Sequence, residues 1–183
     1  MTALATTPET ATWQLDPTHS SVEFAVKHLM IATVKGTFTG LAATLTTDEA
    51  HPESPSLRVT VDVNTISTHQ EQRDNHLRSA DFFDVAKYPS IVFEAKSIKG
   101  DILGEFELTG DLTMHGVTKP ITLDVSFEGR AKDPWGNARL GYTASGKLRR
   151  SDYGLNWNQA LETGGMLVSD EVKISVDVQF VRK

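Results

Sequence analysis

Strict alternation of apolar and polar residues dominates this sequence. The apolar members recur at every second position in segments 22–26, 57–63, 106–114, 121–127 and 172–180. Successive side chains of a β-strand point to opposite faces, so this period of two predicts strands with one apolar and one polar face. Antiparallel sheets with one face on the core and the other in water have this character. The alternation therefore predicts an all-β fold.

Turns and further strands complete this pattern. Less regular runs that add strands lie at 33–46, 90–98 and 139–148. Asp133–Gly136 has Pro and Gly where a type I turn needs them, His115–Gly116 is placed as a hairpin turn, and Gly164–Gly165 open the last strand. An antiparallel sheet of about eight or nine strands has to hide its edges. We predict a closed antiparallel β-barrel of about eight strands, similar to lipocalins and streptavidin.

One segment, near residues 69–88, breaks the alternation and predicts a short helical insertion. Thr68–Glu71 matches the T-x-x-E capping box, whose side chains bond the free amides of a first helical turn. A helix is therefore expected from His69 to about Ser79. A second turn is expected over Ser79–Asp84, and it ends before Pro89 because the residue preceding a proline avoids the α region.

The adjacent rings of Phe82 and Phe83 suggest a role for this insertion. One helix face cannot bury two neighbouring rings against the same partner. We interpret the segment as a lid or wall at the mouth of the barrel, with Phe82 or Phe83 touching a ligand. Arg73 and Asp74 are expected to hold it to the rim by charge-assisted hydrogen bonds. The alternative is that both rings complete the core.

The length of the chain, 183 residues, suits one domain. Residues 1–12, rich in Thr and Ala, are predicted to be a flexible N-terminal tail, and residues 13–183 a single barrel domain. The N-terminus has no positive charge and no apolar run of signal-peptide length, which predicts a cytoplasmic protein. No segment has the roughly 20 apolar residues of a membrane helix, so no integral membrane segment is expected.

Charge and residue types exclude several functions. The formal net charge is -6 and no basic run exceeds the pair Arg149–Arg150, which argues against nucleic-acid binding. Cysteine is absent, which excludes disulfides and thiol catalysis. The six histidines show no metal-ligand spacing, and His69 and His76 have Arg73 between them, so we predict no metal site. The sequence contains neither a phosphate-binding P-loop nor the dinucleotide-binding motif G-x-G-x-x-G, so we predict no cofactor.

Asp74 and His76, with Ser67 or Ser79, form the strongest candidate for catalysis. No G-x-S-x-G elbow accompanies them, and an activated nucleophile needs a base that a third group orients. We therefore predict a protein without catalytic residues. An enzyme that acts on an isoprenoid-type lipid with Asp74 and His76, or Tyr142, as acid or base is the alternative.

The barrel interior is the predicted binding site. Small residues at inward positions, namely Ala43, Ala144, Gly36, Gly110 and Gly146, leave room for a cavity. Glycines at bulges or bends are the alternative explanation. The predicted ligand-binding residues are Phe24, Val26, Val34, Phe38, Val59, Val61, Phe82, Phe83, Phe93, Phe106, Leu108, Leu123, Val125, Tyr142, Leu148 and Ile174.

Four sequence blocks resemble one known family. They are Leu15–Phe24 (LDPTHSSVEF), Arg73–Asp84 (RDNHLRSADFFD), Gly110–Thr118 (GDLTMHGVT) and Arg150–Leu155 (RSDYGL) with Trp157. They follow the order of YceI-like proteins, and the resemblance covers about Trp13 to Phe180. His69–Gln70 departs from the Gly-Asn usual in that family, which puts the geometry of the helix entry in doubt.

The resemblance implies an elongated, lipocalin-like barrel that holds polyisoprenoids or similar amphipathic lipids, and it supplies no catalytic residues. We hypothesise a carrier or sequestering protein for a long apolar lipid, either a polyisoprenoid or an isoprenoid quinone. A homodimer is favoured over a monomer because two-fold dimers are common. A structural dimerising module with a filled barrel is a further alternative.

Overall fold

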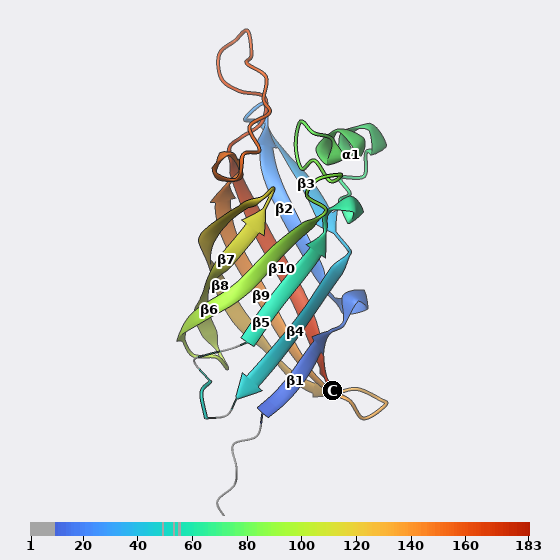
Figure 1. Ribbon diagram of the computed structural model, residues 1–183, viewed down its shortest axis with the longest axis vertical. Coiled ribbons are helices and arrows are strands. Elements are labelled where there is room, and N and C mark those ends of the chain that lie inside the picture. The colour runs from blue at the N-terminus through green and yellow to red at the C-terminus, as the bar shows by residue number, and fades with distance from the viewer. Residues whose placement is uncertain (1–9, 49, 53, 55) are drawn as a thin grey trace, which may run out of the picture.

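The computed structural model describes residues 10–48, 50–52, 54 and 56–183 (Figure 1). The strands are β1 (Thr10–Leu15), β2 (Ser21–His28), β3 (Ala32–Phe38), β4 (Leu41–Asp48), β5 (Ser56–Asp62), β6 (Ser90–Gly100), β7 (Glu105–Met114), β8 (Val117–Lys132), β9 (Ala138–Arg149) and β10 (Glu171–Arg182). The helices are α1 (Glu71–Arg78) and the short 3-10 turns η1 (Pro17–His19), η2 (Val63–Thr65) and η3 (Arg150–Tyr153).

Eight of these strands form a closed antiparallel barrel, which confirms the predicted fold class. The order is β1-β4-β5-β6-β7-β8-β9-β10, and pairing of β1 with β10 closes the ring. Within the described residues the sheet has ten strands, because β2 and β3 extend it beyond β10. The predicted barrel of about eight strands is confirmed, although residues 33–46 form two strands and β1 was not foreseen.

Strand β10 pairs with three other strands of the barrel wall. It runs alongside β9 for nearly its full length, from Glu171 to Val181. Its first half pairs with β2, and its end, near Phe180, pairs with β1. The β2–β3 hairpin therefore continues the wall beyond β1. It does so at the end of the barrel that carries α1, which is the upper end in Figure 1. We call this end the mouth.

The N-terminal boundary differs from the predicted one. Residues 1–9 of the expected tail lie outside the described residues. Thr10 to Thr12, however, pair with Asp48 to Thr46 of β4 and belong to the barrel.

Two of the predicted turns are confirmed, and one is not where it was expected. His115 and Gly116 join β7 to β8 with positive φ angles of 51° and 75°, as a two-residue hairpin turn requires. Asp133–Gly136 joins β8 to β9, with Gly136 at φ 91°. Gly164–Gly165 do not open the last strand, which begins only at Glu171. They lie in the long loop between η3 and β10.

The helical insertion is present, but the predicted capping box is wrong. The N-cap of α1 is Gln70, whose side chain accepts from the Arg73 amide. His69 has a left-handed φ of 60°, which turns the chain and delays the start of the helix to Glu71. Thr68 therefore does not cap the helix, and its hydroxyl donates to Asp74 instead. After α1 the chain continues in hydrogen-bonded turns to Tyr88.

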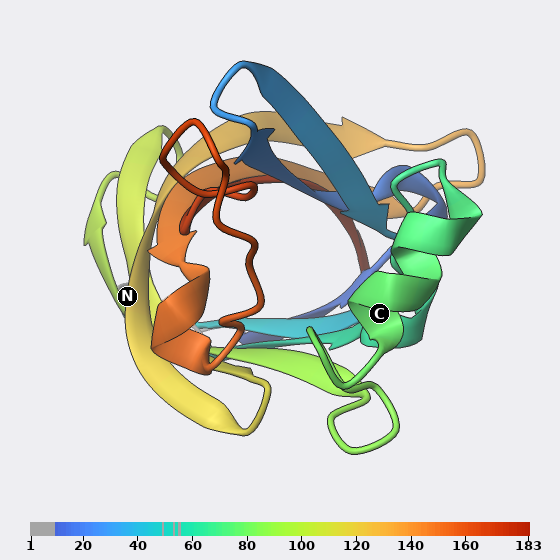
Figure 2. The ribbon, with the colours of Figure 1, turned by 90° about the horizontal axis from the view of Figure 1, so that it is seen from above.

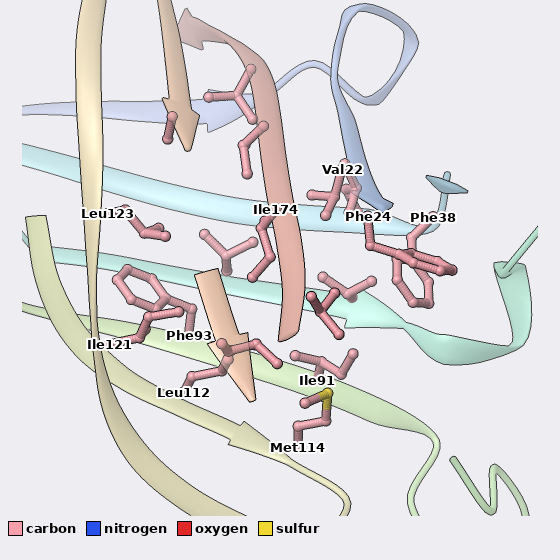
Figure 3. Close-up of a pocket in the computed structure, with 18 of the residues that line it drawn as sticks. Val22, Phe24, Phe38, Ile91, Phe93, Leu112, Met114, Ile121, Leu123 and Ile174 are labelled. Carbon is pink, nitrogen blue, oxygen red and sulfur yellow. The ribbon is translucent and has the colours of Figure 1, made fainter. Parts of the chain in front are cut away.

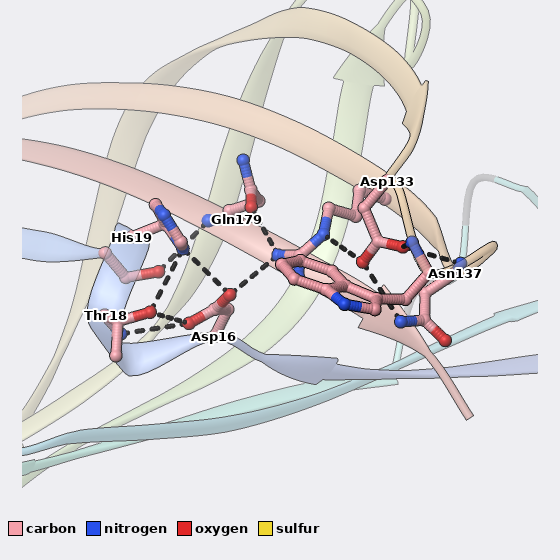
Figure 4. Close-up of polar contacts among 9 residues, drawn as sticks. Asp16, Thr18, His19, Asp133, Asn137 and Gln179 are labelled. Atoms are coloured by element: carbon pink, nitrogen blue, oxygen red, sulfur yellow. Dashed lines mark hydrogen bonds and ion pairs between the residues drawn. The ribbon is translucent and has the colours of Figure 1, made fainter.

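The opposite end of the barrel is tied by a polar cluster, the Asp16 network (Figure 4). Its members are Asp16, Thr18, His19, Asp133, Asn137, Arg139 and Gln179. The Arg139 guanidinium donates to Asp16 Oδ2 at 2.6 Å, to Gln179 Oε1 at 2.6 Å and to Asp133 Oδ2 at 2.9 Å. It thereby joins the β1–β2 connection, the β8–β9 turn and β10.

Hydrogen bonds from Thr18, Arg139 and His19 hold the pKa of Asp16 well below its usual range. For Asp133, desolvation alone would raise the pKa. The hydrogen bonds from Asn137, Arg139 and the Trp135 amide outweigh it and lower the pKa to about 2.

Candidate ligand-binding site

The barrel interior contains an elongated cavity of about 520 Å³. Its wall is made of the inward members of the alternating strands, and the labelled side chains in Figure 3 come from β2, β3, β6, β7, β8 and β10. The register places inward residues directly opposite each other, for example Leu108 beside Leu123 and Phe106 beside Val125. A filled barrel is therefore not what this chain forms.

All sixteen predicted residues line this cavity: Phe24, Val26, Val34, Phe38, Val59, Val61, Phe82, Phe83, Phe93, Phe106, Leu108, Leu123, Val125, Tyr142, Leu148 and Ile174. Further lining residues that the prediction omitted include Val22, Ile91, Leu112, Met114 and Ile121. The same alternation identifies Val22, Leu112, Met114 and Ile121, since each occupies an apolar position of its segment. Trp157 and Leu155, from the loop after η3, also line the cavity and carry no periodic signal.

Ala144 lines the cavity as expected, but the inward glycines do not leave empty space beside them. A Cβ on Gly36 would lie 2.3 Å from Cζ of Phe24, and one on Gly110 would lie 2.5 Å from Cζ of Phe93. The space beside each glycine is thus occupied by a neighbouring ring. The glycines widen the lumen indirectly, because they let these rings lie against the wall.

Tyr142 lies in an aromatic section of the wall. Its ring centroid is 5.2 Å from that of Phe127 and 6.3 Å from that of Phe106. Burial raises the pKa of Tyr142, and a smaller effect of Arg130 opposes the shift. The hydroxyl therefore stays neutral at physiological pH, which makes it a poor general base.

The segment after Thr68 forms part of the mouth (Figure 2). The rings of Phe82 and Phe83 diverge. Phe82 is buried against His76 and Trp157, with centroid distances of 5.1 Å and 5.2 Å. Phe83 is half-buried and meets Phe38 of β3 edge-on at 6.1 Å. Each ring touches a different part of the rim while both line the cavity.

Arg73 and Asp74 fasten this segment to the barrel through Thr68. Asp74 is buried and accepts from the Thr68 amide at 2.8 Å as well as from its hydroxyl. Arg73 donates to the Thr68 hydroxyl at 2.7 Å and to the Thr68 carbonyl at 3.0 Å. Ser67, the preceding residue, pairs with Thr37 of β3. Charged side chains of α1 therefore hold the segment to the rim.

A family model described as the YceI-like domain matches residues 13–180. The chain belongs to the YceI-like family. Protein YceI of Salmonella newport (strain SL254) is 38% identical over 167 residues, which cover 90% of this chain and 83% of the relative. Protein YceI of Escherichia coli O157:H7 is 38% identical over 165 residues, with the same shares covered.

Solved structures share the fold. The YceI protein of Campylobacter jejuni aligns with a TM-score of 0.73 and 34% identity over 86% of this chain and 90% of that one. BcnA of Burkholderia cenocepacia aligns with a TM-score of 0.77 and 22% identity over 90% of this chain and 98% of that one. A polyisoprenoid binding domain from Saccharophagus degradans aligns with a TM-score of 0.69 and 15% identity over 93% of this chain and 98% of that one.

Three of the four blocks that carry the YceI-like resemblance meet at the mouth. Arg73–Asp84 contains most of α1 and both phenylalanines, and Arg150–Leu155 lies in and after η3. The block around the β7–β8 hairpin meets the latter, because His115 Nδ1 donates to the Tyr153 carbonyl at 3.0 Å. The remaining block contributes Asp16 to the network at the opposite end.

Arg150 is a buried cation at this mouth that sequence reasoning missed. Its guanidinium donates to four carbonyl oxygens, those of Leu155, Trp157, Val168 and Ser169, at 2.7 to 3.3 Å. Burial lowers the pKa of Arg150, and Asp170 opposes the shift. These bonds hold both arms of the long loop against the rim, an arrangement that no local sequence pattern signals.

Asp74 and His76, the candidate acid and base, have separate partners. Asp74 Oδ1 is engaged by Thr68, whereas His76 Nε2 lies 2.8 Å from Asp81 Oδ2. Among the described residues, no three His, Asp or Glu side chains gather as metal ligands. Within the same residues no helix has the length and apolar character needed to cross a bilayer.

Proposed function

We propose that this YceI-like protein binds a long, largely apolar lipid inside its barrel and carries or sequesters it without catalysis. A polyisoprenoid or an isoprenoid quinone is the ligand class that we favour. The observation that carries the proposal is the continuous cavity lined by inward apolar side chains of the strands. The polyisoprenoid binding domain that shares the fold supports it.

The physics of such a cavity favours selection by length and shape. Each buried methylene contributes about 0.8 kcal/mol, so a long chain needs few polar contacts for tight binding. Lost chain and rotational freedom sets the net affinity. The separate partners of Asp74 and His76 support a role without acid–base chemistry.

Mass spectrometry of organic extracts tests this proposal on protein purified without detergent. We expect one class of long-chain lipid to co-purify with the wild type. Ala144→Phe should abolish it, because Ala144 lines the cavity and a ring there obstructs the lumen. Ser145→Phe is the matched control, since Ser145 is exposed on the outer face of the same strand. An extract without lipid, or equal lipid in Ala144→Phe and the wild type, contradicts the proposal.

The homodimer and the cytoplasmic location remain predictions from the sequence. Light scattering tests the first: a mass near 20.1 kDa, that of a single chain, over a wide concentration range excludes the dimer.

A further inference from the structure

The ionisable side chains that line the cavity have an uneven distribution of charge. The chain has 24 acidic and 18 basic residues. Yet His28, Arg73, His76 and Arg150 line the cavity, and no Asp or Glu among the described residues does so. In a protein of net charge -6, an apolar cavity whose other ionisable lining residue, Tyr142, stays neutral is lined by basic groups without a carboxylate, an asymmetry that favours anions.

These four residues belong to the mouth, and contacts around its rim connect three of them, His28, His76 and Arg150. His76 meets the ring of Trp157 edge-on at 4.8 Å, and the Trp157 carbonyl accepts from Arg150 at 2.8 Å. Arg150 also donates to the carbonyl of Val168, the residue that pairs with His28. The basic groups therefore surround the entrance, where the polar end of a ligand with a buried tail would lie.

Arg73 and His76 also border the solvent side of the entrance. A shallow outer depression is lined by Gln70, Gln72, Arg73 and His76, so the last two face both this depression and the cavity. Arg73 uses Nε and Nη2 on Thr68, and no atom of the described residues accepts from its Nη1. The exposed guanidinium thus keeps donor capacity beside the cavity.

The nearest carboxylates lie outside the lining of the cavity. Asp74 is buried and takes hydrogen bonds from Thr68, and Asp81 is bonded to His76. Asp170, near Arg150, accepts from Arg149 and Ser151. Each is engaged by a partner of its own, and none lines the cavity.

We propose that the mouth recognises an anionic end group, a carboxylate or a phosphate, on the ligand whose apolar tail lies in the barrel. Arg73 is the residue that contacts the end group, because a guanidinium donates paired hydrogen bonds to both chemistries. Arg150 contributes charge rather than direct contact, since carbonyl oxygens occupy four of its five N–H donors. This inference rests on the proposed lipid-binding function and specifies its ligand as a single-chain anionic amphiphile.

Matched pairs of probes that differ only in the end group test the inference on delipidated protein. The pairs are hexadecanoate with hexadecanol and farnesyl phosphate with farnesol, each at submicellar concentration in a competition assay. The acid of at least one pair should bind about 10- to 100-fold more tightly than its alcohol, the range expected for a hydrogen bond to a charged group. The pair with the larger ratio tells whether the end group is a carboxylate or a phosphate.

Variants identify the residue. Arg73→Gln should lower the affinity for the acids much more than the affinity for the alcohols, so that most of the preference is lost, and Arg73→Lys should keep part of it. Arg58→Gln is the control, because Arg58 lies on the outer face of β5, paired with Glu94. Thermal unfolding verifies that each variant is folded.

Equal affinity for acid and alcohol in both pairs overturns the inference and leaves the proposed function standing. An acid preference that Arg73→Gln does not reduce overturns the role of Arg73. If neither acids nor alcohols bind, the proposed function itself fails.

Discussion

At Gly36 the width of the cavity depends on the absence of a side chain. Gly36 pairs directly with Phe24 across β2 and β3, and the Phe24 ring occupies the position of the missing Cβ. The Phe93 ring likewise occupies the position of a Cβ on Gly110, although these two residues are not directly paired. The glycines and rings therefore act as pairs that set the shape of the lumen.

Gly36→Ala should displace the Phe24 ring into the cavity, since the new Cβ would lie 2.3 Å from Cζ. We expect weaker binding of long apolar ligands and a stability loss of about 1–3 kcal/mol, as is typical of overpacking. Adding Phe24→Leu should recover much of the binding. Gly141→Ala is the control, because its Cβ would meet only the Glu128 Cβ at 3.5 Å. Titration and chemical denaturation measure both effects. Wild-type binding by Gly36→Ala would show that the ring does not limit the lumen.

Among the elements, the segment from Thr68 to Tyr88 differs most from the rest of the fold. It contributes no strand to the barrel, and it is fastened through Thr68 and through the contacts of its two phenylalanine rings. The rings differ in burial, since Phe82 is 8% exposed and Phe83 only half-buried. We expect this difference to separate a structural role from a gating role.

Phe82→Ala should lower the free energy of unfolding by about 3–5 kcal/mol, as is usual for a buried phenylalanine. Phe83→Ala should cost less stability and speed ligand release, because its half-buried ring lines the cavity at the mouth beside Phe38. Denaturation curves and stopped-flow displacement of a fluorescent lipid measure the two effects. Each variant serves as the control for the other. If neither substitution alters the exchange rate, the ligand enters elsewhere.

On the scale of the whole molecule, the two ends of the barrel are built differently. The mouth combines loops, α1 and basic side chains, whereas Arg139 joins three segments at the opposite end (Figure 4). The Asp16 network stabilises the end opposite the mouth. The carboxylates of this network make its contribution to stability depend on pH.

The lowered pKa values of Asp16 and Asp133 predict the direction of this pH effect. A carboxyl with a lowered folded-state pKa stabilises the fold above its unfolded pKa, and this stability is lost as pH falls through the folded value. For Asp133 the loss occurs between its usual value of 3.8 and about 2. Arg139→Met removes the shared donor, so acid unfolding should begin at a higher pH. Circular dichroism during acid titration measures this, with Arg58→Met as the control. Identical midpoints for both variants would contradict the role of Arg139.

The alternation by itself determined that the chain forms an antiparallel barrel and which side chains face its interior. This was possible because a period of two is a local property of an extended chain. The His115–Gly116 turn was predictable for the same reason, since two adjacent residues carry its signal. The helix start was not, because the left-handed His69 and the buried Asp74 override the T-x-x-E pattern.

Only the tertiary structure decided how the barrel closes and what surrounds its mouth. The closure of β1 on β10 joins Leu15 to Phe180, and the Asp16–Arg139 pair spans 123 positions of sequence. His28, Arg73, His76 and Arg150 likewise come from separate parts of the chain. No local period records such contacts, because they depend on which strands become neighbours when the sheet closes on itself.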